Sequence, residues 1–236
     1  MLYLLPNLLD PEASPQSAFP PEVFTLVPNL DGLIVENEKE GRKYLKHFTF
    51  PEGKTFREIP LALLNEQTKA DILPGLLQPL LKGENWGLIS DCGLPILADP
   101  GARLVHLARE HNIPVAAYPG PSSILLALML TGLPAQQFAF HGYLPRKEAE
   151  LIPLLKTLER RSSNEGSTHL FIETPYRNTQ LFRILLEALS SSTRLAVAAN
   201  LTGKNQSVTT LPISQWKKQP HPDLHKQPAI FLFRAG

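Results

Sequence analysis

The 236-residue sequence contains one cysteine, Cys92, no long apolar run and a formal net charge of only +1. A single cysteine excludes an internal disulfide and a cysteine-based metal site. The apolar runs fall short of the about 18 residues that a membrane-spanning helix needs, and the apolar start is too short and uncharged for a signal peptide. The near-neutral charge gives no argument for nucleic acid, although it allows a local basic patch. We therefore expect a cytoplasmic protein without membrane contact.

Several motifs of common enzyme classes are also missing. The sequence has no Gly-x-Gly-x-x-Gly, which disfavours an ordinary dinucleotide-binding domain, and no Gly-x-Ser-x-Gly nucleophile elbow. Gly203 and Lys204 lack the upstream glycine of a phosphate-binding P-loop. His221 and His225 lie four positions apart, but Pro222 disfavours the helix that would place both rings on one face for zinc. Nucleotide hydrolases, triad hydrolases and metal sites are therefore not predicted.

Proline, in contrast, is abundant, with 23 residues, about twice the average usage. Six of them fall in the first 28 residues: Pro6, Pro11, Pro15, Pro20, Pro21 and Pro28. This density predicts a long loop over 6–28, with at most one turn of helix. Such a loop is either a lid beside a functional site or a flexible excursion, and we favour the lid because long loops are uncommon without a function.

Short apolar runs alternate with amphipathic stretches, which predicts a largely parallel α/β protein. The expected strands are residues 2–5, 32–35, 56–59, 86–89, 113–117, 138–141, 169–173, 195–200, 208–211 and 229–233. The expected helices are residues 36–48, 65–82 (kinked or divided by its prolines), 102–111, 123–130, 148–160 and 178–190. The helix over 123–130 is apolar nearly all round and is expected to be buried. A division near Tyr118 would give two domains, 1–118 and 119–236.

Residues 86–134 carry the strongest functional signal. In this stretch a strand, a loop rich in glycine and proline, and a helix occur twice in succession. The first loop, 90–101, contains two Asp, two Gly and two Pro; the second begins at Tyr118 and precedes the helix that Ser122 can cap. Glycine lets a ligand approach the backbone, and proline fixes the path of the chain. Because ligands of open α/β sheets bind beyond the carboxyl ends of strands, these two loops are the predicted site.

An ordered set of motifs resembles one known family. The set comprises Asn65-Glu-Gln-x-Lys-Ala70, Ser90-Asp-Cys-Gly-Leu-Pro95, Asp99-Pro-Gly101, Pro119-Gly-Pro-Ser-Ser123, Gly132-Leu-Pro134, Gly142-Tyr-Leu-Pro-Arg-Lys147, Phe171-Ile-Glu-Thr-Pro-Tyr-Arg177 and Asn200-Leu-Thr-x-Lys204. The family is the class III (tetrapyrrole methylase-like) S-adenosylmethionine-dependent methyltransferases, in the branch that methylates the 2′-hydroxyl of a cytidine in 16S ribosomal RNA. Each motif alone is common, but their order along nearly the whole chain is specific.

The resemblance implies two α/β/α domains with mainly parallel or mixed sheets, a cleft between them that holds S-adenosylmethionine, and a homodimer. The implied cofactor-binding residues are Asp91, Gly93, Leu94, Ile96, Ser123, Ile124, Ile172, Ala199, Pro228 and Ala229. Asp91 can accept hydrogen bonds from the cofactor, and free amides at the start of the 123–130 helix suit a carboxylate. The simpler interpretations are a turn for Asp91, a helix cap for Ser123, core positions for Ile172 and Ala199, and a small buried apolar residue for Cys92.

The segments expected to face the methyl acceptor depart from the family pattern. A Pro-x-Gly-Asn-Leu stretch is replaced by a glycine-free segment at 5–10, and an expected Glu-Asp-Thr-Arg is Glu36-Asn-Glu-Lys39. A lysine keeps the charge of arginine but loses its planar fork. The expected acceptor-side residues are Asn37, Lys39, Arg146 and Lys147. Glu36, at a strand end, is the best candidate for a general base, although an ordinary surface glutamate remains an alternative.

Three functions therefore remain open. The favoured one is methyl transfer from S-adenosylmethionine to a ribose hydroxyl of ribosomal RNA. A second is methylation of a small molecule such as a tetrapyrrole. A third is a binding module that holds the cofactor without catalysis, which the lost glycine and the arginine-to-lysine change would allow.

Overall fold

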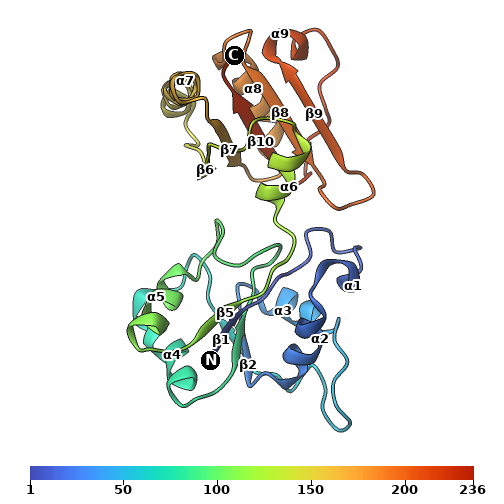
Figure 1. The fold of residues 1–236 in the computed structure, drawn as a ribbon, viewed down its shortest axis with the longest axis vertical. Coiled ribbons are helices and arrows are strands. Elements are labelled where there is room, and N and C mark those ends of the chain that lie inside the picture. Colours follow the sequence, from blue (N-terminus) through green and yellow to red (C-terminus); the bar gives the residue numbers. More distant parts are fainter. The chain divides into compact units, whose positions relative to one another are not determined.

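The computed structural model describes residues 1–236, and the chain divides into two compact units, Met1–Ser122 (unit 1) and Ser123–Gly236 (unit 2). Each unit contains one five-stranded sheet with helices on both of its faces (Figure 1). The predicted α/β class with two layered sheets is confirmed. No helix is both long and apolar enough to cross a membrane.

The sheet of unit 1 is parallel throughout. Its strands, in spatial order, are β3 (Leu61–Leu63), β2 (Gly32–Val35), β4 (Trp86–Leu88), β1 (Leu2–Leu4) and β5 (Val115–Ala117). The chain leaves β1 toward β2 and leaves β4 toward β5, so the connections of these two neighbouring strands run in opposite directions. The carboxyl ends of β1 and β4 therefore form a topological switch point, where open α/β sheets bind ligands.

Helices cover both faces of this sheet (Figure 1). One face carries α1 (Pro15–Ala18), α2 (Pro21–Leu26) and α3 (Glu38–Leu45), and the other carries α4 (Leu73–Leu81) and α5 (Ala102–Glu110). Short 3₁₀ turns lie at Val27–Asn29 and Ala70–Ile72. Alternation along β2 supplies both cores, because Leu33 and Val35 pack with the first group of helices and Ile34 packs with the second.

Two predictions for unit 1 were wrong. The proline-rich stretch 6–28 is neither a lid nor a flexible loop, because α1 and α2 form there and Phe19, Val23 and Val27 are buried in the core. The strand expected at 56–59 is absent, and β3 forms after it. The carbonyl oxygens of Phe56 and Ile59 instead accept hydrogen bonds from the Arg42 guanidinium over 2.9 and 2.8 Å.

The sheet of unit 2 is mixed. Its strands, in spatial order, are β6 (Phe138–Tyr143), β7 (Thr168–Ile172), β10 (Ala229–Arg234), β8 (Arg194–Ala199) and β9 (Ser207–Pro212). Only the β6–β7 pair is parallel, and the other three pairs are antiparallel. The carboxyl ends of β6, β7 and β8 therefore share one edge with the amino ends of β9 and β10.

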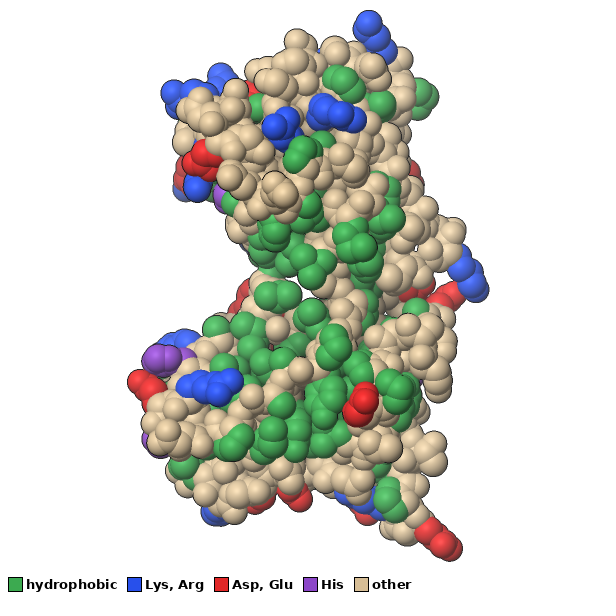
Figure 2. All heavy atoms as spheres, in the orientation of Figure 1, with side chains coloured by type: hydrophobic (Ala, Val, Ile, Leu, Met, Phe, Trp, Pro, Cys, Tyr) green, Lys and Arg blue, Asp and Glu red, His purple; other side chains and the backbone are tan.

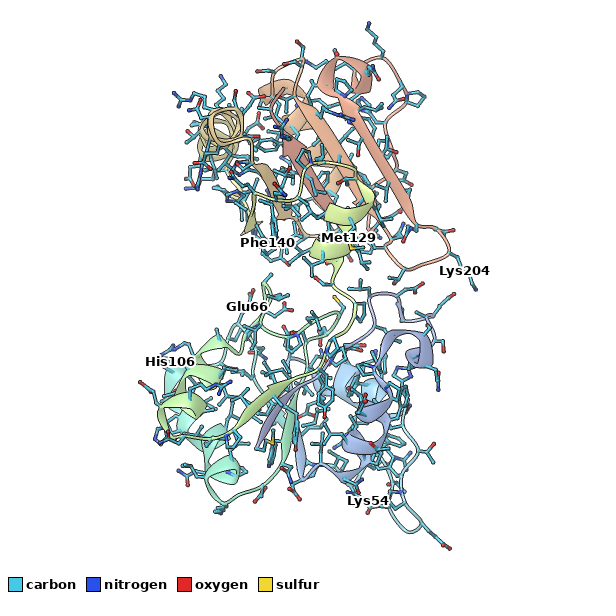
Figure 3. All side chains as sticks on the ribbon, in the orientation of Figure 1. Lys54, Glu66, His106, Met129, Phe140 and Lys204 are labelled. Carbon is cyan, nitrogen blue, oxygen red and sulfur yellow. The ribbon has the colours of Figure 1, made fainter.

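The helices of unit 2 also lie in two layers. The first contains α7 (Glu148–Glu165), α8 (Asn178–Ala188) and α9 (Ile213–Trp216), and the second is α6 (Ser123–Leu130). The burial predicted for α6 holds only for part of it. Ala127 and Leu128 pack on the sheet, whereas Met129, labelled in Figure 3, is 76% exposed, because a helix presents only one of its sides to a sheet.

Candidate functional site

The loops that follow β1, β2 and β4 are joined by hydrogen bonds at one edge of unit 1, which we call the site edge. The side-chain amide of Asn7 donates to the carbonyl oxygens of Ser90 and Asp91, each over 2.9 Å. Its side-chain oxygen accepts the backbone N–H of Leu8 over 2.8 Å. The Asn7 backbone N–H donates to the carbonyl of Gly93 over 2.7 Å. Asn7 therefore fixes the start of the β4 loop to the end of β1.

Glu36 is the titratable group at the centre of this edge. One of its carboxyl oxygens accepts the backbone N–H of Asp91 over 3.1 Å, and its carbonyl accepts the Asn65 side-chain amide over 3.4 Å. Partial burial, together with the charges of Asp99 and Asp91, raises the pKa of Glu36 to about 7. A carboxyl with such a pKa exists in both protonation states near neutral pH, which suits a group that accepts and releases a proton.

Asp91 and Asp99 complete an acidic group around Glu36. Burial, followed by the charge of Glu40, raises the pKa of Asp91, and burial is also the main cause of a raised pKa for Asp99. The Ser90 hydroxyl is buried beside the Glu36 and Asp99 carboxyls and partly offsets the rise in both pKa values. These residues do not form a metal site: no group of three or more His, Cys, Asp or Glu side chains is arranged to hold a metal ion.

The loop after β4 has an unusual backbone. Gly93 and Gly101 have φ angles of 73° and 132°, and the non-glycine residues Ile96 and Ala98 have φ angles of 77° and 71°. A β-branched residue such as Ile96 rarely adopts positive φ, and strain of this kind is concentrated at functional sites. Of the predicted cofactor residues on this loop, Gly93 is buried, and Leu94 and Ile96 are half-buried.

The second predicted loop, after β5, lies against the loop after β1. A Cβ atom on Gly120 would lie 2.1 Å from the Cβ of Pro6, so only glycine permits this approach. The close contact between the two loops therefore explains why the residue between the two prolines is glycine. The two loops meet beside the switch point.

Two hollows of about 420 Å³ each open in unit 1. One is lined by the loop after β1, by residues of α3 and of the two positions that follow it, and by Asp91 and Cys92, and we call it the α3 hollow. The other is lined by Asn65, Glu66 (labelled in Figure 3) and the segment 98–104. Glu36 is hydrogen-bonded to a lining residue of each hollow, Asp91 in the first and Asn65 in the second.

The predicted residues of unit 2 come together through strand register. Ala229 pairs with Ala199, and Ile230 pairs with Ile172, so the ends of three strands meet at one edge of the sheet. The Asn200 N–H donates to the carbonyl of Pro228 over 3.0 Å. Ile172, Ala199, Pro228 and Ala229, although distant in sequence, are thus neighbours in space. Ser123 and Ile124 lie in the first turn of α6 and are half-buried.

Three polar residues at the same edge were not singled out from the sequence. Glu173 is buried, and its carboxyl oxygen lies 3.2 Å from the Nε of Arg177. Asn178 is fully buried: its amide donates to the carbonyl of Gln227 over 2.6 Å, while its side-chain oxygen has no hydrogen-bond partner. The motif Phe171–Arg177 was the available signal, but burial of its polar side chains cannot be read from sequence.

The predicted acceptor-side residues have different settings. Asn37 caps α3, its side chain accepting the backbone N–H groups of Lys39 and Glu40. Lys39, Arg146 and Lys147 are exposed. Cys92, expected as a small buried residue, is exposed on the loop after β4, so that expectation was wrong.

A family model described as Tetrapyrrole (Corrin/Porphyrin) Methylases matches residues 33–216. A protein of Vibrio cholerae serotype O1 named Ribosomal RNA small subunit methyltransferase I is 32% identical over 187 residues, covering 79% of this chain and 61% of the relative. The protein of that name from Escherichia coli O157:H7 is 32% identical over 193 residues, covering 80% and 64%. This chain thus spans less than two thirds of the length of these relatives.

Solved structures share the fold. The methyltransferase CobJ superposes with a TM-score of 0.64 at 14% identity, covering 100% of this chain and 94% of that chain. The cobalt precorrin-4 methyltransferase CbiF gives a TM-score of 0.62 at 12% identity, covering 99% and 94%. At such identities the likeness shows the fold alone. With the family model matching most of its length, the chain belongs to the tetrapyrrole (corrin/porphyrin) methylases.

Proposed function

We propose that this chain is an S-adenosylmethionine-dependent methyltransferase whose acceptor is a ribose 2′-hydroxyl of small-subunit ribosomal RNA. The names of the two relatives and the family support the reaction and the acceptor. The observation that carries the proposal is Glu36, whose carboxyl has a pKa of about 7 at the switch-point edge and is hydrogen-bonded to the strained loop after β4. We also propose that the enzyme acts in the cytoplasm as a homodimer.

The chemistry of the site-edge residues fits the cofactor. Asp91 is exposed beyond β4 and offers a carboxylate to hydroxyl or ammonium groups, while Leu94 and Ile96 offer apolar surface for adenine and ribose. We also assign Gly93 to cofactor binding; its φ of 73° sets the path of this loop, and its lack of a side chain lets the loop pass close to Leu9. When bound, S-adenosylmethionine supplies an electrophilic methyl group on a sulfonium. From unit 2 we assign to cofactor binding Ser123, Ile124, Ile172, Ala199, Pro228 and Ala229.

Glu36 supplies the proton chemistry of the proposed reaction. As the acceptor oxygen gains the methyl carbon and the carbon–sulfur bond breaks, the hydroxyl proton passes to the Glu36 carboxylate. A positioned base contributes about 10²–10⁴-fold, whereas alignment of the reacting atoms can contribute about 7–11 kcal/mol. Positioning is therefore the larger effect, and the Asn7 and Asp91 hydrogen bonds serve it.

The acceptor side of the proposed site includes cationic residues. Lys39, Arg146 and Lys147 are exposed and available to RNA phosphates, and Asn37 lies at the start of the same helix as Lys39. On the face shown in Figure 2, Lys and Arg side chains are scattered in small groups rather than gathered in one patch. This agrees with recognition of a folded ribosomal particle through a few contacts rather than tight binding to any polyanion.

Transfer of a labelled methyl group tests the proposal. The purified protein is incubated with labelled S-adenosylmethionine and small ribosomal subunits reconstituted with unmodified transcribed RNA, and in parallel with a small-molecule extract. Label in the RNA, resistant to alkaline cleavage at the adjacent phosphodiester, supports the proposal, because ribose methylation blocks the 2′-oxygen. Label only in the extract indicates a small-molecule acceptor. Cofactor binding by calorimetry without any transfer indicates an inactive binding module, and either result overturns the proposal.

A further inference from the structure

The α3 hollow has features of a binding site that the cofactor residues do not use. Its wall is formed by the loop after β1, including Leu9, and by residues of α3 and of the two positions that follow it, and it shares only Asp91 with the cofactor residues assigned above. Its volume of about 420 Å³ lies within the range of about 300–1,000 Å³ typical of small-ligand pockets. The hollow lies wholly within unit 1.

The lining of the α3 hollow is chemically mixed. Lys43 and Lys46 bring ammonium groups, and the Lys43 Nζ lies 2.7 Å from a carboxyl oxygen of Glu40. Burial lowers the pKa of His47, so this imidazole is neutral at pH 7 and offers both a donor and an acceptor. Tyr44 also lines the hollow, and its buried hydroxyl has no hydrogen-bond partner. Such a lining suits a ligand with a charged phosphate, a planar apolar face and several hydrogen-bonding groups.

The hollow is connected to the proposed reaction centre through one residue. Asp91 contributes to the lining of the hollow, and its backbone N–H donates to Glu36 over 3.1 Å. Enzymes that do chemistry on a base turn its whole nucleotide out of the stack into a pocket, and the ribose moves with the base.

Resting on the proposed function, we propose that the α3 hollow receives the acceptor nucleotide turned out of the RNA. Its phosphate lies on Lys46 and Lys43, and its base lies in the space between the loop after β1 and α3. The His47 imidazole and the Tyr44 hydroxyl offer hydrogen bonds to the polar groups of the base, which leaves the Asp91 carboxylate to the cofactor. The ribose then lies on the side of the hollow nearest Glu36.

A charge reversal at Lys46 tests this placement, with a matched control. Lys46 and Lys82 are both exposed, but Lys82 lines neither hollow. Lys46→Glu should weaken binding of a short single-stranded RNA about tenfold and lower the slope of log affinity against log salt by about 0.7, as loss of one phosphate contact requires. Lys82→Glu makes the same charge change elsewhere and should leave both values near those of the parent protein.

A second measurement locates the base. RNA carrying a photoreactive base at the methylated position should crosslink to peptides containing residues 7–11 or 40–47, and Lys46→Glu should reduce this yield. Equal effects of the two lysine variants, or crosslinks confined to other peptides, would overturn the inference. These outcomes are distinct from failure of the proposed function. If the protein methylates RNA but the two lysine variants bind RNA equally well, only the nucleotide site is overturned. If RNA binding depends on Lys46 but no methyl group is transferred, only the proposed enzymatic activity is overturned.

Discussion

The side-chain nitrogen of Asn7 lies 2.9 Å from the carbonyl oxygen of Asp91 and donates a hydrogen bond to it, although the two residues are 84 positions apart. A second hydrogen bond from the same amide reaches the carbonyl of Ser90. The relationship matters because Asp91 also donates to Glu36 through its backbone. Asn7 thus supports, from the end of β1, the loop that carries both the proposed cofactor contacts and the partner of the proposed base.

Replacing Asn7 should loosen this loop. Asn7→Ala removes two donors and one acceptor from a buried position, and net values of about 0.5–1.5 kcal/mol per hydrogen bond give a loss of about 2 kcal/mol in the free energy of unfolding. Cofactor affinity, measured by calorimetry, should fall about tenfold as the loop orders on binding. Asn29→Ala is the control, because the Asn29 amide bonds only to an exposed carbonyl of its own turn. Equal urea midpoints and affinities for the two variants would contradict the role of Asn7.

The role of Glu36 as a base predicts an effect on turnover alone. Glu36→Gln keeps the size of the side chain but cannot accept a proton, so kcat should fall about 10²–10⁴-fold while the cofactor Kd stays unchanged. In the parent enzyme kcat should rise with pH and level off above about 7, where the carboxyl becomes ionised. The variant should lack this rise. Equal turnover of both proteins on reconstituted subunits would exclude Glu36 as the base.

The sequence predicted the strands of unit 1 where apolar residues form a compact run, as at Trp86 and in the residues before Glu36. It misplaced the edge strand, because the deciding contact is made by Arg42, well separated in sequence from the carbonyls of Phe56 and Ile59. The local sequence pattern cannot predict which side chain, distant in sequence, will donate a hydrogen bond to a given backbone carbonyl oxygen. The same limit applies to residues 6–28, for which the sequence predicts a loop: the high proline content outweighs the helical spacing of Phe19, Val23 and Val27, which are buried in the core.

The candidate site shows a similar division. The loops after β4 and β5 could be predicted, because glycine, proline and aspartate at strand ends each favour turn conformations for a known physical reason. The grouping of Ile172, Ala199 and Ala229 follows only from the register of β7, β8 and β10, which the resemblance implied but no local pattern indicates. The buried Asn178 was missed because its environment is set by tertiary packing.

A buried histidine in unit 2, His169, which contacts the half-buried His141, predicts loss of stability in acid. The Nε2 of His141 lies 2.7 Å from the Nδ1 of His169, and burial, followed by the charge of His141, lowers the pKa of His169 to about 4. The unfolded chain has an ordinary pKa of about 6.5, so it binds the proton more readily below that pH. The contribution is fully present above pH 6.5 or so and declines as the pH falls toward about 4, by on the order of 2 kcal/mol.

Urea unfolding at about pH 7.5 and about pH 5 measures this contribution, with His169→Gln as the comparison. The raised pKa values of Glu36, Asp91 and Asp99 act with the opposite sign, because those carboxyls bind protons more readily in the folded state. The two proteins share these carboxyls, so the difference between their pH responses isolates the histidine. The variant should lose less stability on acidification than the parent. An identical pH response would show that His169 is not the acid-sensitive group.

The loops after β1 and β5 approach each other closely at Gly120. We therefore expect a glycine-to-alanine change to lower the free energy of unfolding there and to raise it at Gly75, which has open space around it. Gly120→Ala places a methyl group against the Pro6 ring, 2.1 Å from its Cβ, and should reduce the free energy of unfolding by about 1–3 kcal/mol. Gly75→Ala adds the same atom inside α4, where nothing lies within 4 Å, and should raise it by about 0.5–1 kcal/mol through helix propensity. Relative to the parent protein, the urea midpoint should therefore be lower for Gly120→Ala and higher for Gly75→Ala. If Gly120→Ala were as stable as the parent, the loops after β1 and β5 would not meet as described, and this contact would not stabilise the site edge.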